Sequence, residues 1–236
     1  MSQQPSADLS PRTVTDRAMW RQLPNLLTIA RLALAAVFFV VLNQYRYRTE
    51  GADHPAVLWV AMAIFIIAAL TDIADGYLAR RWHVESTFGR IMDPFCDKVL
   101  VIGALIYLAG PRFVDPAAAA EQHFFTMVSG FYPWMVVVIL ARELLVTGIR
   151  GELEGMGIKF GAKIWGKLKT LFQTVGIPFL LGIVALDPNA PGHEWMKVVR
   201  EFFVYGITGI TVLSGVPYIT GARTAMLAQG DAKHNR

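Results

Sequence analysis

Six apolar runs alternate with polar segments along the 236-residue chain. They cover residues 26–42, 56–70, 99–110, 124–145, 168–186 and 202–219. A helix needs about 20 residues to cross the hydrocarbon core of a bilayer, so runs of this kind are typical of membrane spans. The second and third runs are short, and we expect their helices to continue into polar ends. The pattern predicts an all-α integral membrane protein with six transmembrane helices.

Polar segments flank these runs at both ends of the chain. The first segment has no apolar core followed by a small-residue cleavage site, so we do not expect it to be a secretory signal. We predict a polar cytoplasmic tail over residues 1–21, a six-helix membrane domain over 22–222 and a second polar cytoplasmic tail over 223–236. The longest cytoplasmic connection is expected over residues 149–166, which contain five glycines.

The composition supports a membrane protein and excludes several other classes. Hydrophobic residues make up 54% of the chain and charged residues only 17%, against about 25% charged in soluble proteins. The mean hydropathy is +0.43. This balance disfavours a soluble enzyme and excludes disordered, collagen-like and disulfide-rich chains. Cys96 is the single cysteine, so no intrachain disulfide can form.

The positions of the basic residues predict how the chain is oriented in the membrane. Cytoplasmic segments of membrane proteins are enriched in Lys and Arg. With the N-terminus inside, sixteen of the 22 Lys and Arg residues fall on the cytoplasmic side. Six spans then place both termini in the cytoplasm, at the inner membrane. The net charge of +4 is thus explained by topology rather than by nucleic-acid binding. Arg31 lies inside the first span, where an isolated charge needs a partner.

Four aspartates follow the second run and precede the third: Asp72, Asp75, Asp93 and Asp97. Carboxylates at membrane depth are costly and usually functional. Within each pair the spacing of three or four residues puts both side chains on one helix face, and Pro94 suits the first turn of the third span. Facing carboxylates need a cation to stay ionised. Oxygen ligands select Mg²⁺ or Mn²⁺, and two such ions are the usual clamp for displacement at phosphorus.

The residues around the aspartates suit a phosphate-bearing substrate. Gly76 and Gly89 allow a ligand to approach the backbone closely, and Ala79 keeps the helix face narrow. Arg80 can offer paired donors to a diphosphate, and Ser86 offers a hydroxyl group. The alternative is that the aspartates are solvated interfacial charges that balance neighbouring arginines and lysines.

The spacing of these residues resembles the signature of a known family. The order is Asp72-x-x-Asp75-Gly76-x-x-Ala79-Arg80 followed by Gly89-x-x-x-Asp93-x-x-x-Asp97. All eight positions are similar to those of the CDP-alcohol phosphotransferases, integral membrane enzymes of lipid synthesis, and the resemblance extends over residues 22–220. It implies six membrane helices, a homodimer, and transfer of a phosphoryl-alcohol group from a CDP-linked donor with release of CMP.

The resemblance also implies roles for individual residues. The four aspartates would hold two Mg²⁺ ions, with Mn²⁺ as a possible substitute, and Asp97 would be the general base. The CDP-lipid would be held by Asn25, Thr28, Gly76, Ala79, Arg80, Ser86 and Gly89. For Asn25 and Thr28 an ordinary helix start after Pro24 explains the sequence equally well.

The second half of the chain indicates the acceptor. It contains Ala141-Arg142-Glu143, Arg150 and Gly166-Lys167-Leu168-Lys169-Thr170 with Gln173. In these residues it is similar to the bacterial phosphatidylglycerophosphate-forming branch of the family, which implies CDP-diacylglycerol as donor and sn-glycerol 3-phosphate as acceptor. An acceptor with its own phosphate needs convergent cationic donors. The candidates are Arg142, Arg150, Lys167 and Lys169, although the excess of basic residues in cytoplasmic segments would also explain them.

Two other functions remain open at the level of sequence. The same chemistry with phosphatidylglycerol as acceptor would give cardiolipin, and inositol phosphate or serine would give other phospholipids. A transporter could instead use the aspartates as an ion relay, although such charges would be expected along a pathway rather than at one membrane face.

Overall fold

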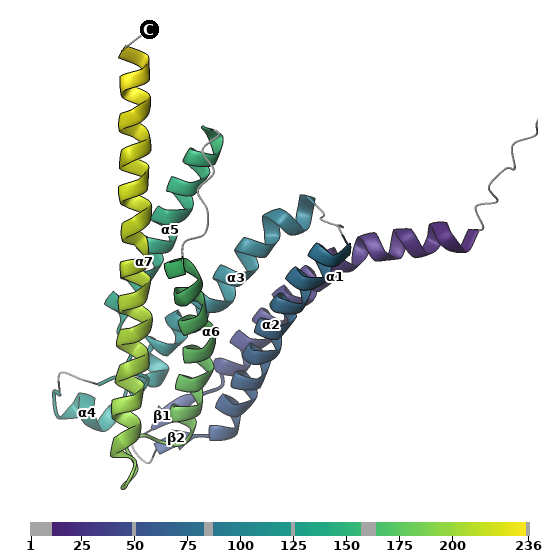
Figure 1. Ribbon diagram of the computed structural model, residues 1–236. Helices are drawn as coiled ribbons and strands as arrows, with labels where there is room; N and C mark the ends of the chain where they lie inside the picture. Colours follow the sequence, from purple (N-terminus) through teal and green to yellow (C-terminus); the bar gives the residue numbers. More distant parts are fainter. Residues whose placement is uncertain (1–10, 49–50, 83–86, 124–125, 157–163, 235–236) are drawn as a thin grey trace, which may run out of the picture.

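The computed structural model describes residues 11–48, 51–82, 87–123, 126–156 and 164–234. In these residues six long helices form almost the whole fold (Figure 1). They are α1 (Pro11–Leu42), α2 (Pro55–Trp82), α3 (Thr87–Leu108), α5 (Pro133–Gly155), α6 (Ile164–Ala185) and α7 (Glu194–His234). The short elements between them are β1 (Arg46–Arg48), β2 (Gly51–Asp53), the 3-10 helix η1 (Pro111–Phe113) and α4 (Pro116–Ala120). The predicted helical class is confirmed, and the small antiparallel β1–β2 hairpin adds to it.

Each of the six apolar runs lies wholly or mostly within one of the long helices. Among the described residues, three helical segments are both long and apolar enough to cross a membrane: Pro55–Ile73, Ile164–Ala185 and Glu194–Thr224. Two shorter apolar segments are Thr28–Leu42 and Lys98–Leu108. The chain is therefore a membrane protein with several candidate spans, and the number six stays a prediction.

Several predicted boundaries differ from the helix ends. Helix α1 begins at Pro11 rather than near Pro24, and α7 continues to His234, so both segments predicted as tails are helical where they are described. The predicted connection over 149–166 begins later, because α5 continues to Gly155. Helix α3 begins at Thr87, so Pro94 lies inside it and not in its first turn. A proline inside a helix removes one intrahelical hydrogen bond and crowds the preceding turn, yet the residues before Pro94 are still helical.

The long helices pack in a closed ring. Helix α1 contacts α2 and α3, α2 contacts α6, α6 contacts α7, α7 contacts α5, and α5 closes the ring against α3. Buried aromatic rings fill part of its interior, and the rings of Phe38 on α1 and Phe65 on α2 lie 5.7 Å apart. Large apolar residues such as Ile73, Val137 and Val198 are exposed on the outside. This distribution is what a surface facing lipid requires.

Glycines allow close approach where helices cross. A Cβ atom at Gly103 on α3 would lie 2.3 Å from Cζ of Phe39 on α1. The absence of that atom lets the ring of Phe39 stack on Tyr107, with 5.6 Å between ring centroids. Gly176 on α6 likewise makes room for Ile207 on α7, because a Cβ there would lie 2.7 Å from Cδ1 of Ile207.

Hydrogen bonds fasten the loops together at the end of the bundle that carries β1, β2 and α4 (Figure 1). The Tyr47 hydroxyl donates to Oδ1 of Asp187 at 2.9 Å. The amide of Asn189 donates to the Tyr47 hydroxyl and to Oδ2 of Asp115. Burial raises the pKa of Tyr45 and of Tyr47 above the ordinary value, so both hydroxyl groups stay protonated. These bonds join β1 to the segments that follow α3 and α6.

The five basic residues predicted on the non-cytoplasmic side gather at this same end. They belong to β1, η1 and the first turns of α7, and they are Arg46, Arg48, Arg112, Lys197 and Arg200. The asymmetry of Lys and Arg therefore follows the two ends of the bundle. Which end faces the cytoplasm stays a prediction from that asymmetry.

Candidate active site

Arg31 has a carboxylate partner on the neighbouring helix. Its side chain is 1% exposed on α1, and Nη1 lies 2.7 Å from Oδ1 of Asp72 on α2. Thr28, one turn earlier on α1, is also buried. A buried guanidinium needs a charged or polar partner, so this ion pair explains how an arginine is tolerated within an apolar helix. It also holds the first motif aspartate against α1.

The remaining motif residues lie on two helices that both pack against α1. Positions 75, 76, 79 and 80 belong to α2, and positions 89, 93 and 97 belong to α3. The side chains of Asp75, Asp93 and Asp97, like that of Asn25, are outside the described part, and Ser86 lies outside the described residues altogether. Among side chains that are described, no group of three or more His, Cys, Asp or Glu could hold a metal. The ligand set therefore stays a prediction.

Replacing Arg31 by Met should destabilise the protein, because Asp72 would lose its partner. Asp72 is 43% exposed, so water would compensate in part, and we expect a loss of about 1–3 kcal/mol. Thermal unfolding in detergent without divalent metal measures this loss. The double variant R31M/D72N should recover part of the stability. If the loss of stability in the double variant equals the sum of the losses in R31M and D72N, the ion pair contributes nothing.

A second charged group lies between α5, α6 and α7 and is centred on Glu143. The Glu143 side chain is 9% exposed, and its Oε1 accepts from Nη1 of Arg142 at 3.0 Å and from Nζ of Lys169 at 2.6 Å. Arg150, two turns further along α5, donates from Nη2 to the hydroxyl of Tyr218 on α7 at 3.1 Å. We call Arg142, Glu143, Arg150 and Lys169 the cation cluster.

The cation cluster has more positive than negative charge, and some of its hydrogen-bond donors have no acceptor among the described residues. Its three cations face one carboxylate, which leaves two positive charges without an anion inside the cluster. The Nε atoms of Arg142 and Arg150 are buried, and neither has a hydrogen-bond partner among the described residues. Unsatisfied buried donors are costly. An anionic ligand with several acceptor oxygens would satisfy both the charge and the donors.

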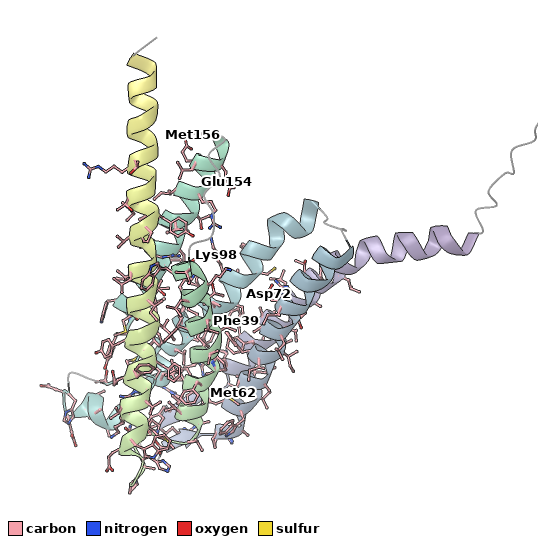
Figure 2. The ribbon with its side chains drawn as sticks, in the orientation of Figure 1. Phe39, Met62, Asp72, Lys98, Glu154 and Met156 are labelled. Carbon is pink, nitrogen blue, oxygen red and sulfur yellow. The ribbon has the colours of Figure 1, made fainter. Side chains whose placement is uncertain are left out.

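Lys98 connects this cluster to the aspartate motif. It directly follows Asp97 on α3, and its Nζ donates to Oγ1 of Thr147 on α5 at 2.5 Å. The Thr147 hydroxyl donates in turn to the backbone oxygen of Glu143 at 2.7 Å. In Figure 2 the labelled Lys98 and Asp72 lie at a similar level of the bundle, between Glu154 at one end and Met62 at the other. The last motif aspartate thus lies next to a residue anchored beside the cation cluster.

The structure brings three of the four predicted acceptor residues into this region. Arg142, Arg150 and Lys169 are in the cluster, whereas Lys167 is exposed on α6 and no ion pair joins it to the cluster in the described residues. The sequence did not single out Glu143 or Tyr218 as site residues. A lone acidic residue within the apolar part of α5 was the available signal for Glu143, and no local pattern indicated Tyr218.

Long apolar helices, an aspartate motif on α2 and α3, and a buried cluster suited to anions define an integral membrane enzyme that acts on phosphate compounds. The model of the CDP-alcohol phosphatidyltransferase family matches residues 21–214. The chain belongs to this family, whose members are transferases of phospholipid biosynthesis.

Relatives share most of their length with this chain. The CDP-diacylglycerol–glycerol-3-phosphate 3-phosphatidyltransferase of Bacillus subtilis is 37% identical over 163 residues, which cover 67% of this chain and 76% of that protein. The protein of the same name from Cereibacter sphaeroides is 37% identical over 185 residues, covering 75% and 73%. A probable phosphatidylglycerophosphate synthase of Mycobacterium tuberculosis is 34% identical over 217 residues, covering 92% and 89%.

Proposed function

We propose that the protein transfers the phosphatidyl group of CDP-diacylglycerol to sn-glycerol 3-phosphate, giving phosphatidylglycerophosphate and CMP at the cytoplasmic face of the membrane. The observation that carries the proposal is the buried cation cluster, to which Lys98, the residue after Asp97, is linked through Thr147. The names of the relatives point to the same donor and acceptor.

The charge of the cation cluster favours an acceptor with its own phosphate monoester. Such a phosphate carries nearly two negative charges at neutral pH, which would balance the two positive charges left by Glu143. The Nε donors of Arg142 and Arg150, which have no hydrogen-bond partner in the part of the chain that the structure describes, suit its oxygen atoms. Serine brings no phosphate, and phosphatidylglycerol brings a singly charged diester with two acyl chains. Inositol phosphate would match the charge equally well, and the relatives' names favour glycerol 3-phosphate over it.

Asp72, Asp75, Asp93 and Asp97 would hold two Mg²⁺ ions, for which Mn²⁺ could substitute. Carboxylate oxygens are the ligands that such hard cations prefer, and the Asp72 carboxylate lies on α2 against Arg31 of α1. When bound, the ions would neutralise the diphosphate and increase the acidity of the acceptor hydroxyl.

Other residues of the chain would bind the substrates and move the proton. Arg80, Ser86 and the backbone at Gly76, Ala79 and Gly89 would hold the CDP part, with Asn25 and Thr28 on the nucleotide side. Asp97 would take the proton of the acceptor hydroxyl. The hydroxyl oxygen then forms a bond to the β-phosphorus, and the bond between that phosphorus and the bridging oxygen breaks. CMP leaves with the electron pair.

CMP release by the purified protein tests this proposal. CDP-diacylglycerol is supplied with glycerol 3-phosphate, phosphatidylglycerol, inositol phosphate or serine, with and without a chelator. We expect release with glycerol 3-phosphate, loss of it on chelation and recovery with excess Mg²⁺. Release with another acceptor alone would refute the acceptor, and cation flux without CMP release would favour an ion relay.

A further inference from the structure

Tyr218 is a buried aromatic residue that two arginines of the cation cluster share. It lies on α7 and is 3% exposed. The Cζ atom of Arg142 lies 5.9 Å from the centroid of its ring, and the Cζ atom of Arg150 lies 5.7 Å from it. Nη2 of Arg150 also donates to its hydroxyl oxygen at 3.1 Å. One side chain on α7 thus contacts both guanidinium groups of α5.

This arrangement fixes how far apart the two cations stand. Arg142 and Arg150 are eight residues apart on α5, which corresponds to about 12 Å along the helix axis. Their guanidinium groups nevertheless approach the same ring, so both side chains bend toward one point on α7. Like charges brought together repel, and the negative face of an aromatic ring offsets part of that repulsion. Without the ring, the two side chains would be expected to separate.

The neighbouring residue Gly215 helps to seat Arg142 on α7. It precedes Tyr218 by three positions, so the two lie on the same face of the helix. A Cβ atom at Gly215 would lie 3.3 Å from Cγ of Arg142, which is tighter than an ordinary contact. The glycine therefore lets the stem of Arg142 lie against α7 beside the ring. On its other side Arg142 is held by Glu143.

The two arginines still have donors that nothing described in the chain uses. The Nε atoms of Arg142 and Arg150 are buried and unpartnered among the described residues, and the side chain of Arg142 is 9% exposed. An unsatisfied buried donor is tolerated where a ligand satisfies it. Because both donors belong to groups that contact Tyr218, the ring sets their relative position.

We propose that Tyr218 is a positioning residue for the acceptor: it holds Arg142 and Arg150 at the separation at which their free donors bind the acceptor's phosphate group. The inference rests on the proposed function, because it assumes that the acceptor carries a phosphate. Tyr218 itself acts through the arginines. The proposal therefore predicts an effect on acceptor binding that is separate from effects on the donor lipid and on turnover.

The variants Y218F and Y218L separate the contribution of the hydrogen bond to Arg150 from that of the aromatic ring. Y218F keeps the ring and removes the hydrogen bond to Arg150, and we expect KM for glycerol 3-phosphate to rise about three- to tenfold. Y218L removes both contacts, and we expect a rise of about ten- to thirtyfold. KM for CDP-diacylglycerol and kcat should stay within about twofold of the wild type, because the donor site and the reacting groups are untouched. Y205F is the matched control, since Tyr205 lies on the same helix with its side chain largely exposed.

Calorimetric binding of inorganic phosphate, without CDP-diacylglycerol, supplies a readout besides activity. The wild type and Y205F should bind phosphate alike, and Y218L should bind it at least about tenfold more weakly. Phosphate binding unchanged in Y218L, or absent from the wild type, would overturn the inference. So would losses of equal size in both KM values and kcat that follow a lower melting temperature, because these describe a purely structural residue. A wild type that uses no glycerol 3-phosphate refutes the proposed function, and the phosphate titration still decides the role of Tyr218.

Discussion

Replacing Asp97 by Asn is expected to lower kcat by at least about 100-fold, which is the usual contribution of a general base. The amide cannot accept the proton of the acceptor hydroxyl, and it is a poorer ligand for a hard divalent cation than a carboxylate. The proposed contacts with CDP come mainly from residues on α1 and α2. Binding of CDP-diacylglycerol should therefore persist while turnover fails, and separate measurements of lipid binding and CMP release show the two effects.

Asp187→Asn is a suitable control for this variant. Asp187 lies at the end of the bundle that carries the hairpin, where it accepts a hydrogen bond from Tyr47, and an amide oxygen can still accept that bond. Its turnover should equal that of the wild type. Near-normal turnover in D97N would remove Asp97 from the role of base.

The second large effect is expected from Arg142→Met. The variant removes one cation and its buried donors from the cation cluster, and hydrogen bonds to charged groups contribute about 1.5–3 kcal/mol each. KM for glycerol 3-phosphate should therefore rise about ten- to a hundredfold. KM for CDP-diacylglycerol should change little, because Arg142 lies on α5 and the proposed donor contacts do not. Steady-state kinetics with each substrate varied in turn measures both constants.

Arg46→Met is the control for R142M, because it also removes one positive charge. Arg46 is an exposed basic residue on β1, at the opposite end of the bundle, so its loss changes the net charge equally without touching the cluster. It should leave both KM values unchanged. If R142M raises both constants together, or raises neither, the acceptor's phosphate does not bind at this cluster.

The sequence predicted the long helices because a bilayer selects for continuous apolar runs. It did not predict the ends of these helices, because polar residues beyond an apolar run can still favour a helix. Residues 71–82 contain no proline, so α2 extends through the motif to Trp82. The Ala-rich residues 222–234 favour helix and extend α7 to His234.

The candidate site was predictable where it is local in the sequence. Both pairs of aspartates can be recognised from their spacing, and Arg142 from its place at the end of an apolar run. The residue types alone did not show which of Lys167 and Lys169 binds the acceptor. Residues two apart point in directions that differ by about 200° around a helix. Only one of the two lysines can therefore face Glu143. Tyr218 required the packing of α7 on α5, which joins residues 68 positions apart in the chain.

The most direct test of the proposed transfer follows the phosphorus atom of the acceptor. Purified protein in proteoliposomes is given CDP-diacylglycerol, Mg²⁺ and glycerol 3-phosphate labelled with phosphorus-32, and labelled lipid and CMP are measured together. The proposed transfer predicts label in the lipid fraction in a one-to-one ratio with CMP, as phosphatidylglycerophosphate, and at least about 100-fold slower formation of both products in D97N. CMP without labelled lipid, or labelled lipid without CMP, would contradict it.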